Sequence, residues 1–364
     1  MLPPRWMRRS VLAPGVLLLV FLAVTTLPLW AIAAAALSPS LPGRLRPLRL
    51  LWFALVYLAV EAATLVGLFG LWIASGFGRK VASERWVSAH YRLLGWYLGA
   101  LVRTARRDFN LHIDVEVPTE PIRTDVPLLV FSRHAGPGDS FLLVHDLLRR
   151  GLRPRIVLKG SLRWAPVIDI GLGRIPSHFV DRGAPPGTGT AAVERLAAGL
   201  HPGDALVIFP EGRNWTEQRR TTSITRLEEL GAHEEAEEAR QMRYVLAPRT
   251  GGALAALRAA PVADVLFVAH TGLEDLSSIV DLWRGLPMDA RVQVELWRVP
   301  ADDVPEGDAA RVAWLLAWWR RIDAWIVARF GEEAAPDAVV DIVTEPEDEP
   351  PRGSQGRDAA AEPT

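Results

Sequence analysis

The sequence predicts an α/β fold, a mixed sheet layered with helices, preceded by an N-terminal transmembrane or membrane-embedded helical hairpin. In residues 109–330, short apolar runs alternate with longer amphipathic patterns, which is typical of a sheet covered by helices. Two long apolar stretches lie before this region. Residues 331–364 follow it and are rich in Glu, Asp, Pro and Ala, with few large apolar residues. We therefore expect a disordered acidic tail there.

The composition of the chain excludes some kinds of partner and some kinds of functional site. At 364 residues the chain is long enough for one large or two small domains, and 49% of its residues are apolar. The formal net charge of -1 gives no overall attraction to nucleic acid, so no nucleic-acid partner is expected. The chain has no cysteine, which excludes disulfides, thiolate zinc sites and a cysteine nucleophile. No His, Asp or Glu cluster has metal-ligand spacing, so no metal is expected either.

Residues 1–78 are predicted to form a membrane helical hairpin. Residues 11–37 carry no charge, and residues 48–74 contain only Arg49 and Glu61. Each stretch exceeds the roughly 20 residues that span the apolar core of a bilayer. A Ser-Pro-Ser-Leu-Pro-Gly segment breaks the helix between them. We therefore expect two helices joined by a turn, with the lipid bilayer as a partner.

The basic residues around the hairpin leave its topology open. Those at its two ends place both ends, and the domain that follows, on the cytoplasmic face of the membrane. Those in the turn are unexpected in a translocated loop, so a hairpin that dips into one leaflet remains an alternative to the favoured spanning hairpin. The end residues are Arg5, Arg8, Arg9, Arg79, Lys80 and Arg85, and the turn residues are Arg44, Arg46 and Arg49. For the acid inside the hairpin, Glu61, a packing role is favoured over a functional one.

Residues 79–108 are predicted to form an interfacial helix, basic on one face and aromatic on the other. Arginines alternate there with Trp and Tyr and with an apolar run over residues 93–102. A helix lying in the membrane interface explains this pattern. A core helix of the globular domain explains it equally well. Both interpretations place that domain against the bilayer.

Residues 109–330 are expected to hold the sheet and its helices. The candidate strands are 113–117, 127–131, 155–158, 205–209, 262–268 and 291–299. The candidate helices are 139–150, 188–200, 222–240, 253–259 and 308–330. Functional groups in such a sheet gather where strands end, so the turns after these strands are the places to find a site.

The most informative of these turns joins strand 127–131 to helix 139–150. It reads His134-Ala-Gly-Pro-Gly-Asp139, so a tight loop fixes a His and an Asp five positions apart, and Asp139 or Ser140 can cap the helix. An imidazole titrates near neutrality, and a carboxylate within hydrogen-bond distance sets its tautomer and supports its charged form. Taken alone, the pair is better explained as a solvated histidine beside a helix cap. The rest of the chain reverses that preference.

Four cationic residues occupy comparable turns after other apolar runs. They are Lys159, Arg182, Arg213 and Arg249. Any one of them is most simply a surface charge, but four in equivalent turns indicate a cationic site beside the His-Asp pair. Such a site suits a phosphate group, which guanidinium groups bind in bidentate fashion.

At these residues the chain resembles the glycerolipid acyltransferases of the 1-acylglycerol-3-phosphate acyltransferase and lysophospholipid acyltransferase type. The resemblance covers residues 127–271 in four ordered blocks. It is specific because the H-x4-D motif of His134 and Asp139 is followed, at this spacing, by the Phe-Pro-Glu-Gly of residues 209–212. The implied fold of the acyltransferase domain, residues 109–330, is glycerol-3-phosphate acyltransferase-like.

The resemblance implies a membrane-bound acyltransferase of phospholipid biosynthesis. It would transfer a fatty acyl chain from acyl-CoA or acyl carrier protein to the free hydroxyl of 1-acylglycerol-3-phosphate, giving phosphatidic acid. The donor is a substrate, and no other cofactor is expected. His134 would be the general base and Asp139 its orienting carboxylate, while backbone N–H groups near Gly136 and Gly138 would approach the oxyanion. The residues implied in substrate binding are Glu211, Gly212, Arg213, Arg182, Lys159 and Arg249.

The sequence departs from the family pattern at three places. Arg133 stands where Asn is usual, Gly136 where Ser is common, and Gly212-Arg213-Asn214 where Gly-Thr-Arg is usual. Arg133 has two open roles, lowering the proton affinity of the imidazole or contacting the donor's phosphates. Because the acceptor block is altered, a lysophospholipid acyltransferase with another acceptor, such as lyso-phosphatidylinositol, lysocardiolipin or a glycolipid, remains the alternative.

Two other classes of function are weaker. A thioesterase or serine hydrolase would not need the cationic turns, and the chain has no Gly-x-Ser-x-Gly motif. A non-catalytic membrane adaptor with the same fold would not need an intact His134 and Asp139.

Overall fold

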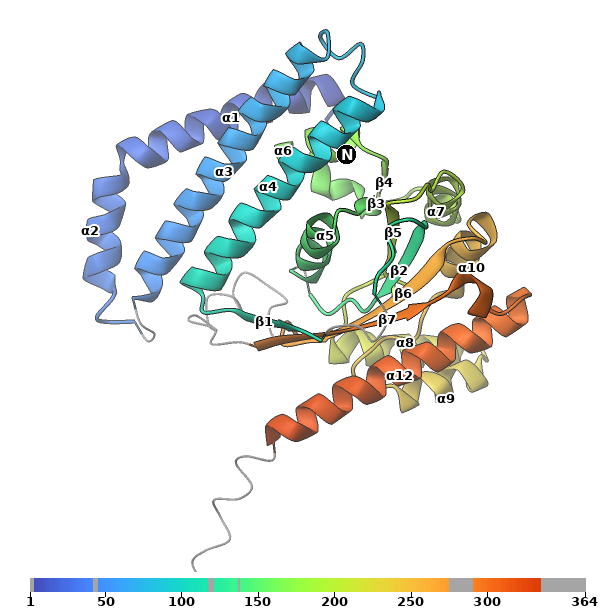
Figure 1. Cartoon of the computed structure of the whole chain (residues 1–364). Helices are drawn as coiled ribbons and strands as arrows, with labels where there is room; N and C mark the ends of the chain where they lie inside the picture. Colours follow the sequence, from blue (N-terminus) through green and yellow to red (C-terminus); the bar gives the residue numbers. More distant parts are fainter. Residues whose placement is uncertain (1–2, 42–44, 117–120, 137, 275–290, 335–364) are drawn as a thin grey trace, which may run out of the picture. The chain divides into compact units, whose positions relative to one another are not determined.

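In the computed structural model, residues 3–41, 45–116, 121–136, 138–274 and 291–334 are described. Figure 1 shows their helices and strands. The helices are α1 Arg5–Thr25, α2 Leu27–Leu37, α3 Arg46–Ala74, α4 Glu84–Asp108, α5 Asp139–Arg149, α6 Pro166–Gly171, α7 Thr188–Ala198, α8 Glu217–Glu229, α9 His233–Gln241, α10 Thr250–Ala259 and α12 Asp308–Ala334. The strands are β1 His112–Val115, β2 Leu128–Ser132, β3 Arg153–Lys159, β4 Ser177–Val180, β5 Asp204–Ile208, β6 Asp264–Thr271 and β7 Arg291–Val299.

The strands form one mixed sheet in the order β1-β7-β6-β2-β5-β3-β4, which confirms the predicted α/β class. The five strands from β6 to β4 are parallel, whereas β7 is antiparallel to β6 and pairs with a parallel β1. Because β2 to β6 are parallel, the turns after all five strands lie at the same edge of the sheet. This is the edge that carries the site.

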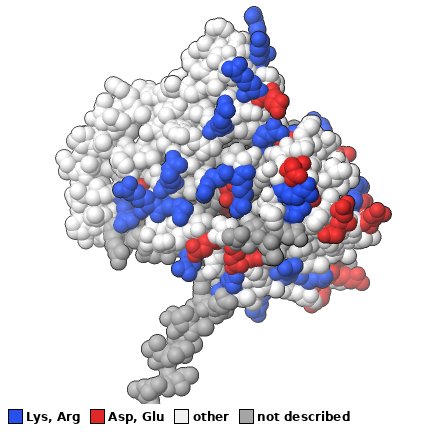
Figure 2. All heavy atoms as spheres, viewed as in Figure 1, with Lys and Arg blue, Asp and Glu red and all other residues white. Residues whose placement is uncertain are grey.

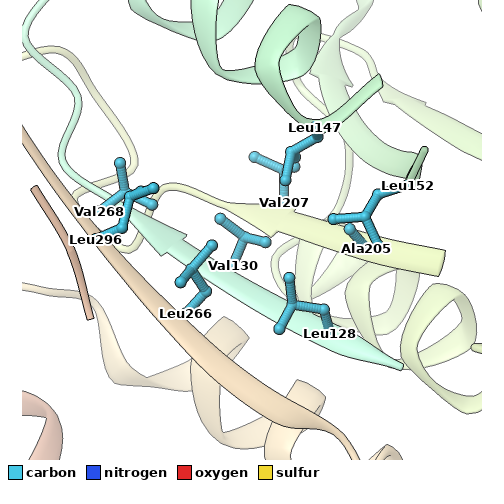
Figure 3. Packing of buried hydrophobic residues seen from close by; sticks show 9 residues of the cluster. All are labelled: Leu128, Val130, Leu147, Leu152, Ala205, Val207, Leu266, Val268 and Leu296. Atoms are coloured by element: carbon cyan, nitrogen blue, oxygen red, sulfur yellow. The ribbon is translucent and has the colours of Figure 1, made fainter. Parts of the chain in front are cut away.

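The sheet is buried between helices on its two faces. On one face α5 covers the central strands: its Leu147 packs with Leu128 and Val130 of β2 and with Val207 of β5 (Figure 3). On the other face Phe267 of β6 stacks on Trp318 of α12, with ring centroids 4.4 Å apart. Central strands buried on both sides explain why the sequence reads there as continuous apolar runs. A fully buried Leu or Val contributes about 1.5–3 kcal/mol.

The N-terminal hairpin differs from the prediction in its first half. The apolar stretch 11–37 forms two helices, α1 and α2, because Pro28 in the first turn of α2 ends the preceding helix near Thr26. Both α1 and α3 are long and apolar enough to cross a membrane. Within residues 79–108 a helix, α4, is present from Glu84 to Asp108, and its Tyr91, Leu94 and Leu98 are buried in a core cluster; an interfacial position stays a prediction.

Polar contacts attach the hairpin to the α/β domain. Asp169 of α6 accepts hydrogen bonds from the side chains of Arg8, at 3.0 Å, and Arg9, at 3.1 Å. Glu61 of α3 accepts from the hydroxyl of Tyr97, at 2.9 Å, and from the backbone N–H of Val167, at 3.1 Å. These contacts agree with the packing role that was favoured for Glu61.

Several element boundaries were predicted incorrectly. The single helix expected at 222–240 is two helices, α8 and α9, because Gly231 adopts a positive φ of 71° between them. Strand β4 was missed, since its four residues carry no run of apolar side chains. α12 continues to Ala334, past the predicted start of the tail at residue 331. Residues 335–364, where the acidic tail was predicted, lie outside the described residues.

Candidate active site

The turn between β2 and α5 brings His134 and Asp139 into contact. Nδ1 of His134 lies 2.9 Å from Oδ2 of Asp139, and the carboxylate side chain is 2% exposed. Asp139 is the first residue of α5, so its place follows from where the helix begins. The predicted pair therefore has the geometry in which a carboxylate holds a proton on Nδ1 and leaves the lone pair of Nε2 for chemistry.

The Asp139 carboxylate also organises the backbone of the loop. Its Oδ2 accepts the N–H groups of Ala135, at 2.7 Å, and Gly136, at 3.0 Å, while Ser140 donates its hydroxyl to Oδ1. The N-cap of α5 is Gly138, not Asp139 or Ser140 as expected. The Gly136 N–H donates to Asp139 within the loop, which corrects the expected approach of this group to an oxyanion; the same expectation for Gly138 stays a prediction.

The environment of Asp139 favours its ionised form. Burial by itself raises the pKa of this carboxyl, but the hydrogen bond with His134, the nearby His270 and the Gly136 N–H together hold the pKa below its ordinary value. Asp139 is therefore a carboxylate at neutral pH. A carboxylate beside Nδ1 stabilises the imidazolium that forms when Nε2 takes a proton.

Glu211 supports the same loop from inside the protein. It follows β5, is 2% exposed, and accepts the backbone N–H of His134, at 3.0 Å, and of Leu246, at 3.1 Å. Burial raises its pKa to about 8, against the opposing effect of Arg133. Both carboxyl oxygens are thus used by the protein itself. The visible role of Glu211 is to join two loops, and contact with the acceptor remains a prediction.

Arg133 is an internal clamp. Its side chain is fully buried and donates to the carbonyl of Tyr244, at 2.8 and 3.0 Å, to the carbonyl of His270, at 2.7 Å, and to the carboxylate of Glu274. A buried guanidinium with these partners does not contact a donor's phosphates, so that possibility is excluded in this structure. Arg133, the residue before His134, instead attaches the start of the loop to the end of β6.

His270 is a site residue that sequence reasoning did not single out. It lies at the end of β6, beside β2, with Nε2 3.7 Å from Oδ2 of Asp139 and 3.2 Å from the carbonyl oxygen of Arg133. Burial and the charge of Arg133 lower the pKa of His270, against the opposing charge of Asp139. The available signal was Ala269-His-Thr271 at a strand end, but its proximity to the loop depends on the pairing of β6 with β2.

Two of the four predicted cations lie near the loop. The N–H of Arg249 donates to the carbonyl of Pro210 at 2.8 Å, which holds the 245–249 segment against the turn after β5. Gly212 in that turn has a φ of 69°, and its Cβ position would lie 3.3 Å from the side chain of Arg249. Gly212 thus leaves room for the guanidinium. The neighbouring Arg213 is exposed to solvent.

The other two predicted cations are farther along the same edge of the sheet. Lys159 ends β3, two strands from β2, and Arg182 follows β4, three strands from β2. At about 4.8 Å per strand, these positions are roughly 10 Å and 14 Å from the line of β2. In the described part of the chain, neither side chain forms a hydrogen bond or ion pair. The edge is therefore cationic, but only Arg213 and Arg249 adjoin the loop.

Comparisons with known proteins show which family part of the chain is similar to. The family model described as Acyltransferase matches residues 114–269. No curated protein matches the chain. Among solved structures, the chain is similar to the crystal structure of the 1-acyl-sn-glycerophosphate (LPA) acyltransferase, PlsC, from Thermotoga maritima, at 13% sequence identity and a TM-score of 0.48, over 78% of this chain and 97% of that one. The matched residues contain the His134–Asp139 pair and the Phe-Pro-Glu-Gly block, as the motifs predicted. Residues 114–269 thus match the family model of an acyltransferase domain.

Proposed function

We propose that the protein is a membrane-bound acyltransferase that converts 1-acylglycerol-3-phosphate to phosphatidic acid, with acyl-CoA or acyl carrier protein as donor. The observation that carries this proposal is the His134–Asp139 pair, with Nδ1 and Oδ2 2.9 Å apart at the edge of the sheet. An acyl transfer to an alcohol needs one base to remove the hydroxyl proton. It does not need a nucleophilic serine or cysteine, since the acceptor hydroxyl is the nucleophile.

In the proposed reaction, His134 handles a single proton. Nε2 takes the proton of the acceptor hydroxyl as its oxygen attacks the thioester carbonyl carbon. The carbon–sulfur bond of the resulting tetrahedral intermediate then breaks, and the same proton passes from Nε2 to the leaving thiolate. The products are an ester and a free thiol. Asp139 stays ionised throughout and stabilises the transient imidazolium.

The acceptor's phosphate is assigned to the cationic edge. Arg213 and Arg249, nearest the loop, are proposed to bind it directly, with Gly212 giving room for Arg249. Lys159 and Arg182 are proposed as further contacts for a larger anionic head group. Because these further contacts would also suit other head groups, and because the Gly212-Arg213-Asn214 block is altered, another lysophospholipid acceptor is the second candidate.

The hairpin is proposed to lie in one leaflet, with the domain on the cytoplasmic face. On the face seen in Figure 2, most of the surface of the hairpin helices carries no charged side chain. α4, which carries several arginines, lies alongside α3: Arg49 donates to the carbonyl of Asp108 at 2.6 Å near one end, and Leu93 packs on Gly67 towards the other. An α3 that crossed the bilayer would draw these charges into hydrocarbon, which is costly. Insertion of α1 and α2 into one leaflet avoids that cost.

The proposed function can be tested with membranes that contain the full chain. They are given labelled acyl-CoA and a panel of lyso-acceptors, beside a His134→Ala control. We expect labelled phosphatidic acid from the parent and none above background from the control. Transfer by the control at the parent's rate would contradict the general-base role. Use of another acceptor in place of 1-acylglycerol-3-phosphate would favour the second candidate.

A further inference from the structure

A cationic groove lies between α4 and α5, away from the turns at the edge of the sheet. Its volume is about 420 Å³, and it is lined by residues that include Arg92 and Gly95 of α4, His145 and Arg149 of α5, and Arg153 of β3. Lys and Arg side chains gather on this face of the molecule, along the border of the uncharged hairpin surface (Figure 2). We refer to this feature as the α4–α5 groove.

The spacing of residues on α4 builds this groove. Arg92, Gly95, Gly99, Arg103 and Arg106 lie three or four residues apart, so they share one face of the helix. The glycines let α5 approach closely: a Cβ at Gly95 would lie 3.9 Å from Leu148, and a Cβ at Gly99 would lie 3.5 Å from His145 Nε2. Arg92 of α4 and Arg149 of α5 line the groove itself, and Arg106 lines the neighbouring cavity.

One arginine of the groove, Arg153, is neutralised by Asp204, but the others are not neutralised by the described part of the chain. The side chains of Arg92, Arg103, Arg106 and Arg149 form no hydrogen bond or ion pair there. The nearest acids are already engaged, since Asp146 pairs with Arg150 at 2.6 Å and Asp204 pairs with Arg153 at 2.8 Å.

The positive charges of these arginines act on His145, which lines the groove. Burial and the charges of Arg149, Arg103 and Arg106 lower the pKa of His145, against the opposing effect of Asp146. Cations near a helix C-terminus are often explained by the helix dipole, and that applies to Arg106 and Arg149. It does not apply to Arg92, which lies in the third turn of α4.

We propose that the α4–α5 groove is a second anion site, which binds the phosphate groups of a ligand. Guanidinium groups on two facing helices fit the geometry of phosphate oxygens. The groove shares His145 and Arg149 with a cavity of about 120 Å³ that reaches Asp139 and His270 beneath the catalytic loop. Two sources of phosphate fit this position: a phosphorylated acyl donor, which rests on the proposed function, and the head groups of the adjoining membrane.

The test measures binding by the purified full chain, separately from acyl transfer. Free coenzyme A is titrated by calorimetry, and flotation is measured with vesicles of phosphatidylcholine, with and without phosphatidic acid. The variant Arg92→Gln/Arg149→Gln is compared with Arg195→Gln/Arg226→Gln, which removes the same charge from the exposed surfaces of α7 and α8. Arg92→Lys/Arg149→Lys keeps the charge, and far-UV circular dichroism checks that every variant is folded.

We expect the groove variant to lose at least about tenfold in affinity for one of the two probes, because charge-assisted hydrogen bonds are lost. The lysine variant should retain part of that affinity, and the surface control should retain all of it. Loss for coenzyme A alone identifies the donor as the source, and loss for phosphatidic acid vesicles alone identifies the membrane. Parental affinity of the groove variant for both probes, or an equal loss in the surface control, would overturn the site. A parent that binds a probe but transfers no acyl chain would contradict the proposed function and not the groove.

Discussion

The His134–Asp139 loop, which is proposed to be the catalytic loop, and the attachment of the hairpin are each organised around two buried carboxyl groups, but the partners of these groups differ. In the loop, Asp139 and Glu211 accept backbone N–H groups from Ala135, Gly136, His134 and Leu246. In the attachment, Asp169 accepts from the side chains of two arginines, and Glu61 accepts from a tyrosine hydroxyl and one backbone N–H.

The two sets of hydrogen-bond partners fix different parts of the protein. Carboxyl groups that accept backbone N–H groups fix the path of the main chain, which general-base chemistry needs. Carboxylates that bind long arginine side chains fix which helices adjoin, but the side chains can adjust if the helices shift. Substitutions in the first region should therefore affect the reaction, and substitutions in the second should affect attachment and stability. The predictions below test that division, from the largest effect to the smallest.

The largest effect is expected from Asp139→Asn. The amide cannot stabilise an imidazolium and can bind Nδ1 in the wrong tautomer, so kcat should fall by roughly 10³- to 10⁴-fold. The measurement is acyl transfer with labelled acyl-CoA, with circular dichroism to check the fold. A folded Asp139→Asn protein with a kcat within a few-fold of the parent's would contradict the assigned role.

Next in size is the loss of the buried ion pair between Arg133 and Glu274. Glu274→Gln leaves a buried guanidinium without its carboxylate and should lower the free energy of unfolding by about 3–5 kcal/mol. Burial raises the pKa of Glu274 by itself, but Arg133 holds it below the ordinary value of 4.5. The contribution is therefore present above that pH and lost as the pH falls through the lower, folded-state pKa.

Urea unfolding of the parent and of Glu274→Gln between pH 3 and 7 measures both effects, and Arg133→Met/Glu274→Leu serves as the control. Replacing both charges with apolar side chains should recover much of the lost stability. A double variant no more stable than Glu274→Gln would show that the pair is not what stabilises this end of β6.

A smaller effect is expected at the hairpin attachment. Asp169→Asn weakens the contacts with Arg8 and Arg9 and should cost about 2 kcal/mol, below the range for fully buried pairs because Arg9 is 23% exposed. Proteolysis between α3 and α4 should become faster while kcat changes little. Asp181→Asn, which breaks an exposed pair with Arg163, is the control and should cost less than 1 kcal/mol. A large fall in kcat for Asp169→Asn would break the division between the two regions.

The effect expected from Glu211→Gln is a change in the slope of stability against pH. Burial raises the pKa of Glu211 to about 8 from an ordinary value of 4.5, so the folded state keeps a proton that the unfolded state loses. The parent should therefore lose stability as the pH rises from about 4.5 to 8, and Glu211→Gln should lack that contribution. Parallel stability–pH curves for the two proteins would contradict the raised pKa.

The sequence predicts the parts of the site that are local in the chain. His134 and Asp139 meet because a strand, a glycine-rich turn and a helix follow one another, and each has a clear residue pattern. The apolar runs also predict the strands of the seven-stranded sheet, except β4, in which Ser177 and His178 leave only two apolar residues, Phe179 and Val180.

The rest of the site depends on the order of strands, which residue patterns do not encode. Arg133 reaches Glu274 across 141 residues, and His270 approaches Asp139 only because β6 pairs with β2. The same order separates Lys159 and Arg182 from the loop, because β5 lies between β2 and the strands that carry them. The four turns that carry these cations therefore lie at different distances from the His134–Asp139 loop.

The contacts of Asp169 set an order of events during synthesis. Arg8 and Arg9 leave the ribosome about 160 residues before their partner, and Glu61 leaves about 106 residues before Val167. In the proposed membrane attachment, the hairpin would meet the bilayer while Arg8 and Arg9 are still without Asp169, which would oppose deep insertion of that end at that stage. Once α6 is made, these charges are neutralised by the newly folded domain, and the anchor and the catalytic loop become parts of one structure.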